Sequence, residues 1–177
     1  GAAAAAKIAA IMGQEAGENI RMTAFVKCAG DCEKTAKSYD YTGVKDCKMV
    51  AFMQNGGEKA CSYGCLGYGS CVKVCGFDAI HIINGIAVAC GKCVAECPKH
   101  LIELIPYQQK QAVACSSKEK GKAVMNACEI GCIGCRKCVK ECPSEAITVV
   151  DNVAHIDYEK CTNCGKCKET CPRNIIL

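Results

Sequence analysis

The stretches GCIGCRKCVKECPSEAITVV (131–150) and KCTNCGKCKETCPRN (160–174) decide the fold of this 177-residue chain. Each holds four cysteines in the spacing C-x2-C-x2-C-x3-C, and a proline follows the fourth cysteine. The first run consists of Cys132, Cys135, Cys138 and Cys142, and the second of Cys161, Cys164, Cys167 and Cys171. The identical spacing indicates that one arrangement of thiols is built twice.

This spacing is that of bacterial ferredoxins with two [4Fe–4S] clusters, in which three close thiolates hold one cluster and the fourth holds the other. Pro143 and Pro172 have a fixed φ and no N–H, which suits a chain that turns away from a cluster. Neither disulfides nor structural zinc, which takes four ligands from separated cysteine pairs, explains two such runs. We expect iron at two sites, one formed by Cys132, Cys135, Cys138 and Cys171 and the other by Cys161, Cys164, Cys167 and Cys142.

A second copy of this pattern comes earlier in the chain. The stretch GCLGYGSCVKVCGFDAIHIINGIAV (64–88) aligns without gaps with residues 131–155, and both copies continue into a further cysteine run. The turn pairs Asn84-Gly85 and Asp151-Asn152 each follow an apolar strand, which predicts a β-hairpin in both copies.

The predicted fold class is therefore α+β, dominated by two tandem bacterial 2[4Fe–4S] ferredoxin-like units made of a hairpin and cysteine loops. A small mixed N-terminal region with its own cysteines precedes them, and its pattern predicts a helix from Ala4 to Met12 and a strand from Arg21 to Lys27. A further strand is expected around Val113. The expected boundaries are 1–57 for the N-terminal region, 58–106 for the first unit, 107–127 for a connector and 128–177 for the second unit.

The first unit departs from the second at one ligand position. Tyr68 stands where the second unit has Cys135, and Cys61 is a candidate replacement. The predicted cluster would then be held by Cys61, Cys65, Cys71 and Cys97. The alternative is a cluster with three cysteines, either with an open iron or as [3Fe–4S]. Cys128 stands at the place that matches Cys61 although the second unit is already complete, so these two cysteines could share another role.

The other departure is a difference in length. The second unit has seven more residues than the first between the hairpin and the second cysteine run, and they include the counterpart of Cys161. We expect that seven residues are absent from the printed sequence between Val88 and Cys90, and that the native chain supplies a fourth ligand there. That ligand would complete a cluster with Cys75, Cys90 and Cys93. A true deletion would leave this cluster with three cysteines.

The remaining cysteines suggest a further centre. Together with Cys61, the spacing C-x3-C-x14-C-x13-C is compatible with an extra cluster in the N-terminal region. The alternative is that these residues are buried or free thiols of a reduced protein. The candidates for the extra cluster are Cys28, Cys32, Cys47, Cys115 and Cys128.

Composition and charge exclude several functions. The formal net charge is +4, but each thiolate that binds a cluster adds a negative charge, and no basic stripe is interleaved with aromatic residues. Nucleic-acid binding is therefore not expected. The chain contains no Walker loop, no GxGxxG motif and no nucleophile–base signature, so no catalytic residue is predicted. No apolar run is long enough to span a membrane. The expected role is electron transfer through four [4Fe–4S] clusters, with one more candidate in the N-terminal region.

Four segments together carry a resemblance to a known family. GCLGYGSC, GCIGCRKCVKECPSEAI, CGKCVAECPKHLIELIP and the early AAKIAAIMG resemble RnfB of the Rnf complex, in its cysteine-rich form from clostridium-like anaerobes and acetogens. The resemblance covers essentially the whole chain. Its specific part is GCLGYGSC with the region before it, because the ferredoxin motifs alone occur in many proteins.

This resemblance implies a function and partners. The Rnf complex is a membrane-bound, ion-translocating ferredoxin:NAD⁺ oxidoreductase, and RnfB accepts electrons from reduced ferredoxin and passes them to the other Rnf subunits. The implied location is the cytoplasmic face of the cell membrane of an anaerobic bacterium. Family members begin with a transmembrane anchor and a small four-cysteine cluster domain, neither of which is present in this sequence. The alternative function is a soluble polyferredoxin, or the electron-input subunit of a hydrogenase-type oxidoreductase.

Overall fold

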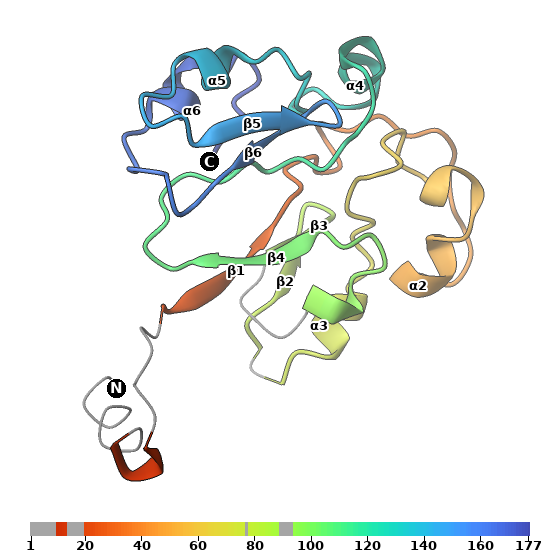
Figure 1. The fold of residues 1–177 in the computed structure, drawn as a ribbon. Coiled ribbons are helices and arrows are strands. Elements are labelled where there is room, and N and C mark those ends of the chain that lie inside the picture. Colours follow the sequence, from red (N-terminus) through yellow and green to blue (C-terminus); the bar gives the residue numbers. More distant parts are fainter. Residues whose placement is uncertain (1–9, 14–19, 77, 89–93) are drawn as a thin grey trace.

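The computed structural model describes residues 10–13, 20–76, 78–88 and 94–177, and shows short helices and strands joined by long cysteine-rich loops (Figure 1). Within this part of the chain the strands pair in three antiparallel two-stranded sheets. The strands are β1 (Met22–Val26), β2 (His81–Ile83), β3 (Ile86–Val88), β4 (Ile102–Pro106), β5 (Ile147–Val150) and β6 (Val153–Ile156). The helices are α2 (Cys47–Val50), α3 (Ser70–Lys73), α4 (Gly121–Ala127), α5 (Lys137–Lys140) and α6 (Lys166–Thr170), with the 3-10 turns η1 (Gln54–Gly56) and η2 (Val94–Glu96).

The sheet of β1 and β4 ties the N-terminal region to the first predicted unit. The two strands run antiparallel, with Val26 opposite Ile102. Alternate side chains of a strand face the same side, which places Ala24 and Val26 together in the core. Met22 is on the same side but is exposed, because it stands at the beginning of the strand. The strand predicted at 21–27 is confirmed. Because its partner lies beyond residue 57, the boundary expected there does not separate two packing units.

Both predicted hairpins form at the turn pairs. Asn84 and Gly85 join β2 to β3 with φ angles of 49° and 75°, and Asp151 and Asn152 join β5 to β6 with φ angles of 48° and 64°. A type I′ turn requires positive φ at both central positions, which Asn, Asp and Gly tolerate best. These residue types made the two hairpins predictable.

The two halves of the chain, 20–106 and 107–177, form their strand pairings in the same order along the sequence. In the first half β1 precedes Cys28, the β2–β3 hairpin follows, and β4 closes against β1. In the second half Val113 precedes Cys115, the β5–β6 hairpin follows, and Ile176 closes against Val113. The strand predicted around Val113 is thus a single bridge. In Figure 1 the β5–β6 hairpin lies above the β1–β4 sheet, and the β2–β3 hairpin overlaps this sheet in the view.

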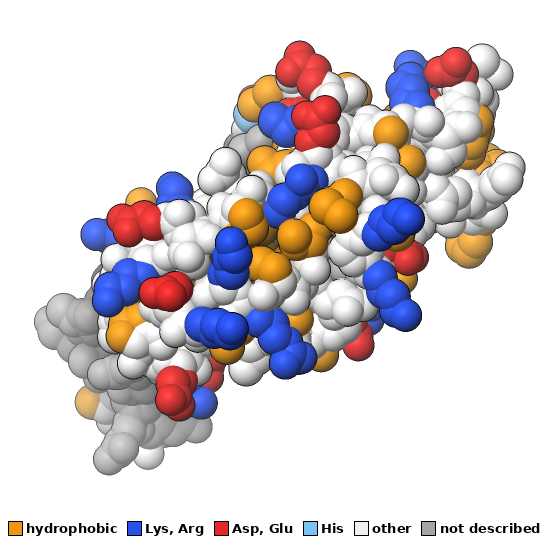
Figure 2. Space-filling model, turned by 90° about the horizontal axis from the view of Figure 1, so that it is seen from above, with side chains coloured by type: hydrophobic (Ala, Val, Ile, Leu, Met, Phe, Trp, Pro, Cys, Tyr) orange, Lys and Arg blue, Asp and Glu red, His pale blue; other side chains and the backbone are white. Residues whose placement is uncertain are grey.

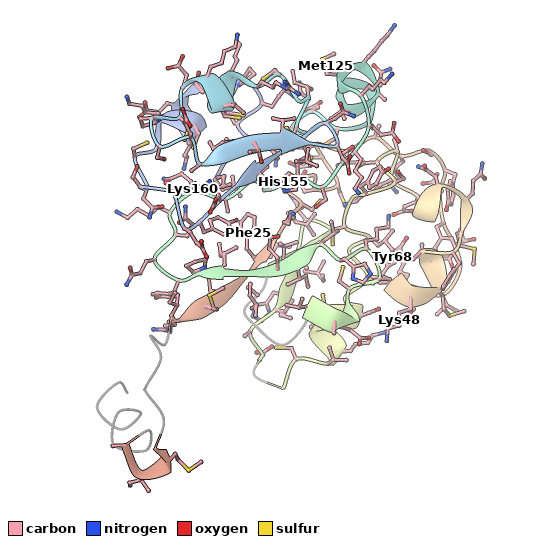
Figure 3. The ribbon with its side chains drawn as sticks, in the orientation of Figure 1. Phe25, Lys48, Tyr68, Met125, His155 and Lys160 are labelled. Atoms are coloured by element: carbon pink, nitrogen blue, oxygen red, sulfur yellow. The ribbon has the colours of Figure 1, made fainter. Side chains whose placement is uncertain are left out.

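Each half has a small core to which cysteines contribute. In the first half Cys71 is buried with residues such as Ile80 and Leu101. In the second half the buried core includes Cys115, Cys132, Cys138 and Cys167. Phe25 of β1 packs against the core of the second half, and Figure 3 shows it between the β1–β4 sheet and the β5–β6 hairpin. The two halves therefore share a packed interface.

The N-terminal helix is described only in part. Residues 10–12 are helical, and the rest of the helix predicted from Ala4 to Met12 lies outside the described residues. In the described ranges, every helix is too short or too polar to span a lipid bilayer.

Candidate metal centres

The second half brings the first predicted cysteine set together. A cavity beside the β5–β6 hairpin is lined by Cys132, Cys135, Cys138 and Cys171. Arg136 adopts a left-handed conformation with φ 60°, and α5 begins after it and turns Cys138 into the core. Burial, followed by the charges of the other three thiolates, raises the pKa of the Cys138 thiol to about 11. Four cysteines thus line one cavity, and the fourth comes from the other cysteine run.

The second predicted set is assembled in the same crossed way. Cys142, Cys161, Cys164 and Cys167 line a separate cavity, again with three cysteines from one run and one from the other. The Gln109 side-chain amide donates a hydrogen bond to Cys161 Sγ at 3.1 Å. At Cys142 burial opposes ionisation, but hydrogen bonds from Ser144 and from nearby backbone N–H groups together hold the pKa of the thiol below its ordinary value. These donors stabilise thiolate sulfur, the form that binds metal.

In the first half, the structure assembles a different set from the one expected. Cys65, Cys71 and Cys97 line one cavity as predicted, but the fourth cysteine in its wall is Cys47, and Cys61 lies elsewhere. The expectation that Cys61 completes this set is therefore not met in the structure. The reason is the long loop before the first cysteine run, which folds back and delivers Cys47 at the start of α2.

Two polar side chains fix Cys47 in this position. Asp46 caps α2 by accepting hydrogen bonds from the N–H groups of Lys48 and Met49 at 2.9 and 3.3 Å. Ser70 donates a hydrogen bond to Asp46 at 3.1 Å and accepts one from the Cys47 N–H at 2.9 Å. Because Ser70 directly precedes Cys71, these contacts link Cys47 to the ligand helix α3.

Tyr68, which replaces a cysteine, fills the space beside Cys47. Its ring lies against Tyr41, with the centroids 6.2 Å apart, and packs on the small core of Cys47, Val50 and Leu66. Its hydroxyl is buried and has no hydrogen-bond partner among the described residues. Burial raises the pKa of Tyr68 to about 12. Figure 3 shows Tyr68 on the side of the molecule that carries α2.

The set of Cys75, Cys90 and Cys93 is described only at its first member. Cys75 Sγ accepts a hydrogen bond from the Ala79 N–H at 3.4 Å. Cys90 and Cys93 lie outside the described residues. This cluster, its fourth ligand and the absent seven residues therefore stay predictions.

The candidates for the extra cluster do not assemble as their spacing suggested. Cys28, Cys61, Cys115 and Cys128 line one cavity of about 140 Å³. Cys47 belongs to the first-half set, and Cys32 is exposed, with its N–H bonded to the carbonyl of Asn84 at 2.9 Å. The set of Cys28, Cys32, Cys47 and Cys61 that the spacing suggested does not form in the structure. Cys32 and Cys47 are not in the wall of the cavity that Cys28 and Cys61 line.

The thiols around the 140 Å³ cavity are in a poorly hydrated environment. Burial raises the pKa of Cys28 and of Cys61, and raises that of Cys115 to about 11. The charges of neighbouring thiolates add to this effect, Cys128 acting on Cys61 and Cys61 on Cys115. No disulfide bond joins two of the described cysteines.

Sequence reasoning missed two features of these sites. Cys47 could not be found from spacing, since contacts between distant residues bring it to its set. A signal did exist for Cys28 and Cys115, because AFVKC (24–28) and QAVAC (111–115) each place a cysteine directly after an apolar segment. Both segments pair with the last strand or bridge of their half: β1 pairs with β4, and Val113 pairs with Ile176.

Comparison with known proteins agrees with these cysteine sites. The family described as 4Fe-4S dicluster domain matches residues 88–146 and 131–175. The chain is 45% identical to the B component of the Na⁺-translocating ferredoxin:NAD⁺ oxidoreductase complex of Acetobacterium woodii, over 99% of this chain and 55% of that protein. It is 42% identical to the corresponding component of the proton-translocating complex of Clostridium ljungdahlii, over 92% of this chain and 60% of that protein.

A third relative is covered to a larger extent. The B component of the ion-translocating oxidoreductase complex of Methanosarcina acetivorans is 43% identical over 97% of this chain and 68% of its own length. The chain spans little more than half the length of the A. woodii relative. That match extends over 184 residues, more than the 177 of this chain, so the relative holds positions without a counterpart here. The identity and coverage show that the chain belongs to the RnfB family of ion-translocating oxidoreductase complexes, and that it contains 4Fe–4S dicluster domains.

Proposed function

We propose that this chain is an electron relay that takes electrons from reduced ferredoxin and passes them into a membrane-bound, ion-translocating ferredoxin:NAD⁺ oxidoreductase. The observation that carries the proposal is the pair of crossed cysteine sets in the second half. This crossing is the ligand pattern of a two-cluster ferredoxin, whose activity is the transfer of single electrons. The relatives at 42–45% identity are named as subunits of such oxidoreductase complexes.

In this proposal the structure has two ferredoxin-like units in tandem. The repeated order of pairings in 20–106 and 107–177 supports it. Four cysteine sets would hold [4Fe–4S] clusters, two in each unit. They are Cys132, Cys135, Cys138 and Cys171; Cys161, Cys164, Cys167 and Cys142; Cys47, Cys65, Cys71 and Cys97; and Cys75, Cys90 and Cys93 with a fourth ligand.

The donor chemistry of these sites fits iron–sulfur clusters. Several cysteine sulfurs accept hydrogen bonds, from the Ala79 N–H at Cys75, from the Leu101 N–H at Cys97 and from Gln109 at Cys161. When bound, a [4Fe–4S] cluster supplies one-electron oxidation and reduction. Hydrogen bonds to its sulfurs and the degree of burial tune the reduction potential, so these residues would set the direction of electron flow.

The donor would approach where a cluster lies near the surface. Cys135 and Cys164 are the exposed members of the two sets in the second half. Cys135 directly precedes the exposed Arg136 and Lys137 at the start of α5. Figure 2 shows Lys and Arg side chains around a small apolar area on the face formed by the upper elements of Figure 1. A donor with an acidic surface would be attracted to this face.

Partners and location follow from the same proposal. The chain would work at the cytoplasmic face of the cell membrane, attached to the other subunits of the complex, which receive its electrons. The direct test is to mix the anaerobically prepared chain with reduced ferredoxin. The visible absorbance of the chain should bleach, and the chain should purify together with membrane subunits. Absorbance that stays unchanged under excess reduced ferredoxin would refute the relay.

A further inference from the structure

A buried lysine without an acidic partner lies in the first half of the chain. The side chain is that of Lys59, and the residue is only 5% exposed. Among the described residues no carboxylate forms an ion pair with its ammonium. The ammonium instead donates hydrogen bonds to the carbonyls of Gly30 and Gly85, at 3.0 Å each. Because a buried charge is costly unless an opposite charge compensates it, Lys59 suits a place next to a group with negative charge.

One of these two carbonyls connects Lys59 to the first-half cysteine set. The Gly85 carbonyl lies against Gly67, where an added Cβ would come within 2.4 Å of the carbonyl oxygen. Gly67 lines the cavity of this set, and its N–H donates a hydrogen bond to the Cys65 sulfur. Only the Gly85 carbonyl and the Gly67 N–H therefore stand between the ammonium and a proposed cluster ligand.

The charge of Lys59 acts on the Cys65 thiol. Burial raises the pKa of Cys65 above its ordinary value, and the charge of the Cys28 thiolate adds to this rise. The N–H groups of Ala87 and Gly67 oppose the rise, and so does the positive charge of Lys59. The same cation opposes the rise in pKa that burial causes at Cys28. A charge that favours thiolates here also favours any other negative charge that is added to the site.

The second half has the same backbone contact without the lysine. The Asn152 carbonyl approaches Gly134, where an added Cβ would lie 2.9 Å from the carbonyl oxygen. In the alignment of the two copies, Asn126 stands at the place of Lys59, and it is neutral and exposed. The buried cation is therefore a difference between the halves.

Another pair of cations is matched between the halves. Lys99 and Arg173 each follow the Cys-Pro pair of their half and line the cavity of a cysteine set. Lys99 donates a hydrogen bond to the Ser62 carbonyl, and Arg173 donates one to the Cys128 carbonyl, both at 2.7 Å. These two charges have equivalent places, so they do not distinguish the halves as Lys59 does.

We propose that Lys59 raises the reduction potential of the cluster held by Cys47, Cys65, Cys71 and Cys97. This rests on the proposed function in one respect, namely that the set binds a [4Fe–4S] cluster. Reduction adds one electron, takes the cluster core from 2+ to 1+ and makes the site more negative by one charge. Reduced ferredoxin gives up this electron and is oxidised, no bond forms or breaks, and no proton moves. A buried cation stabilises the reduced site more than the oxidised site, so Lys59 favours electron flow into the first half.

A redox titration of the full chain, followed by electron paramagnetic resonance, tests this role. Lys59→Gln removes the charge but keeps an amide that can donate hydrogen bonds to backbone carbonyls. It should move the midpoint potential of one cluster to a more negative value. The expected change is about tenfold in the reduction equilibrium, which is about 59 mV for a one-electron couple. The shifted signal should be the one that Cys47→Ser removes or converts, and the iron content should equal that of the parent chain.

Three further variants separate the charge from the packing. Lys59→Arg keeps the charge, so its midpoint potentials should stay close to those of the parent chain. Lys59→Met removes the charge on a side chain of similar length, and it gives the same test if the glutamine variant loses iron. Lys45→Met removes the charge of an exposed lysine in the same half. Water and salt screen that charge, so this control should shift the potential far less than Lys59→Gln does.

The outcomes separate this role from the relay. An unchanged midpoint potential in Lys59→Gln with its full iron content, or an equal shift in Lys59→Arg or Lys45→Met, would overturn the role of the buried charge and leave the relay in place. A parent chain without iron and sulfide would instead overturn the proposed function. A negative shift that is confined to the first-half cluster of the neutral Lys59 variants, and absent from Lys59→Arg, is the result expected.

Discussion

At the scale of single residues, Cys47 completes the first-half cysteine set beside Tyr68. Tyr68 takes the position of a ligand, and its ring fills the volume that a cysteine would leave beside Leu66. Cys47 then enters from the loop before it and is held through Asp46 and Ser70. The motif has Tyr68 in place of a cysteine, and the fourth cysteine of the set, Cys47, comes from an earlier part of the chain.

Cys47→Ser should damage only the first-half cluster of Cys65, Cys71 and Cys97, because it removes the fourth thiolate of that set. Electron paramagnetic resonance of the reduced protein should show the loss or conversion of one cluster signal. Cys32→Ser is the control and should leave every signal intact. If Cys61→Ser removed this signal and Cys47→Ser did not, the set with Cys61 as its fourth ligand would be the correct one.

Tyr68→Phe should leave the cluster intact and improve stability at alkaline pH. Burial raises the pKa of Tyr68 from 10.0 to about 12, so between these values the unfolded chain loses the phenolic proton while the folded chain keeps it. The free energy of unfolding therefore decreases as pH rises through this window. Phenylalanine has no phenolic proton, so the variant does not lose this stability. Thermal unfolding below and inside the window should show an advantage of Tyr68→Phe that grows with pH. An advantage that shrinks with rising pH would contradict the burial of this hydroxyl.

At the scale of elements, the features that depend on neighbouring residues could be predicted from the sequence. The turn pairs at 84–85 and 151–152 and the strand near Val26 are local signals, and the structure agrees with all of them. The sharing of cysteines between two runs also follows from spacing alone. The pairing of β1 with β4 and the delivery of Cys47 depend on contacts between residues far apart in the chain, so no local pattern could predict them.

The crossing of ligands gives an element-scale prediction. Cys171→Ala should damage the cluster of Cys132, Cys135 and Cys138, although Cys171 belongs to the run of α6, because the structure places it in that cavity. Cys142→Ala is the reciprocal variant and should damage the cluster of Cys161, Cys164 and Cys167. In electron paramagnetic resonance spectra, each of the two variants should lose the cluster signal that the other variant keeps. Loss of the cluster within the variant's own run would show that the ligands do not cross.

At the scale of the whole molecule, β1 and the segment 34–37 join two small halves, and one cysteine-lined cavity has residues of both halves in its wall. The cores are small and include cysteines among their buried residues, so bound clusters would contribute to stability as well as to electron transfer. The 140 Å³ cavity lies where both halves meet. The sequence named its four cysteines among the candidates for an extra centre, but spacing could not show that these four line one cavity, since they come from both halves.

Donor docking gives a prediction at this scale. Lys137→Glu should slow the reduction of the chain by ferredoxin several-fold at low ionic strength, because it reverses a charge beside the exposed Cys135. Salt should narrow the difference, as screening weakens long-range attraction. Stopped-flow absorbance would measure the rate. Lys45→Glu, the same change at an exposed lysine of the first half, is the control. Equal rates for Lys137→Glu and the parent chain would place the docking surface elsewhere.

The most direct test of the relay is the content of iron and acid-labile sulfide in the chain prepared without oxygen. The account predicts iron and sulfide in equal amounts, at about four of each per occupied cysteine set. Replacing the crossed cysteines of the second half should remove the iron and sulfide of the two sets in that half. Zinc in place of iron, without sulfide, would contradict it.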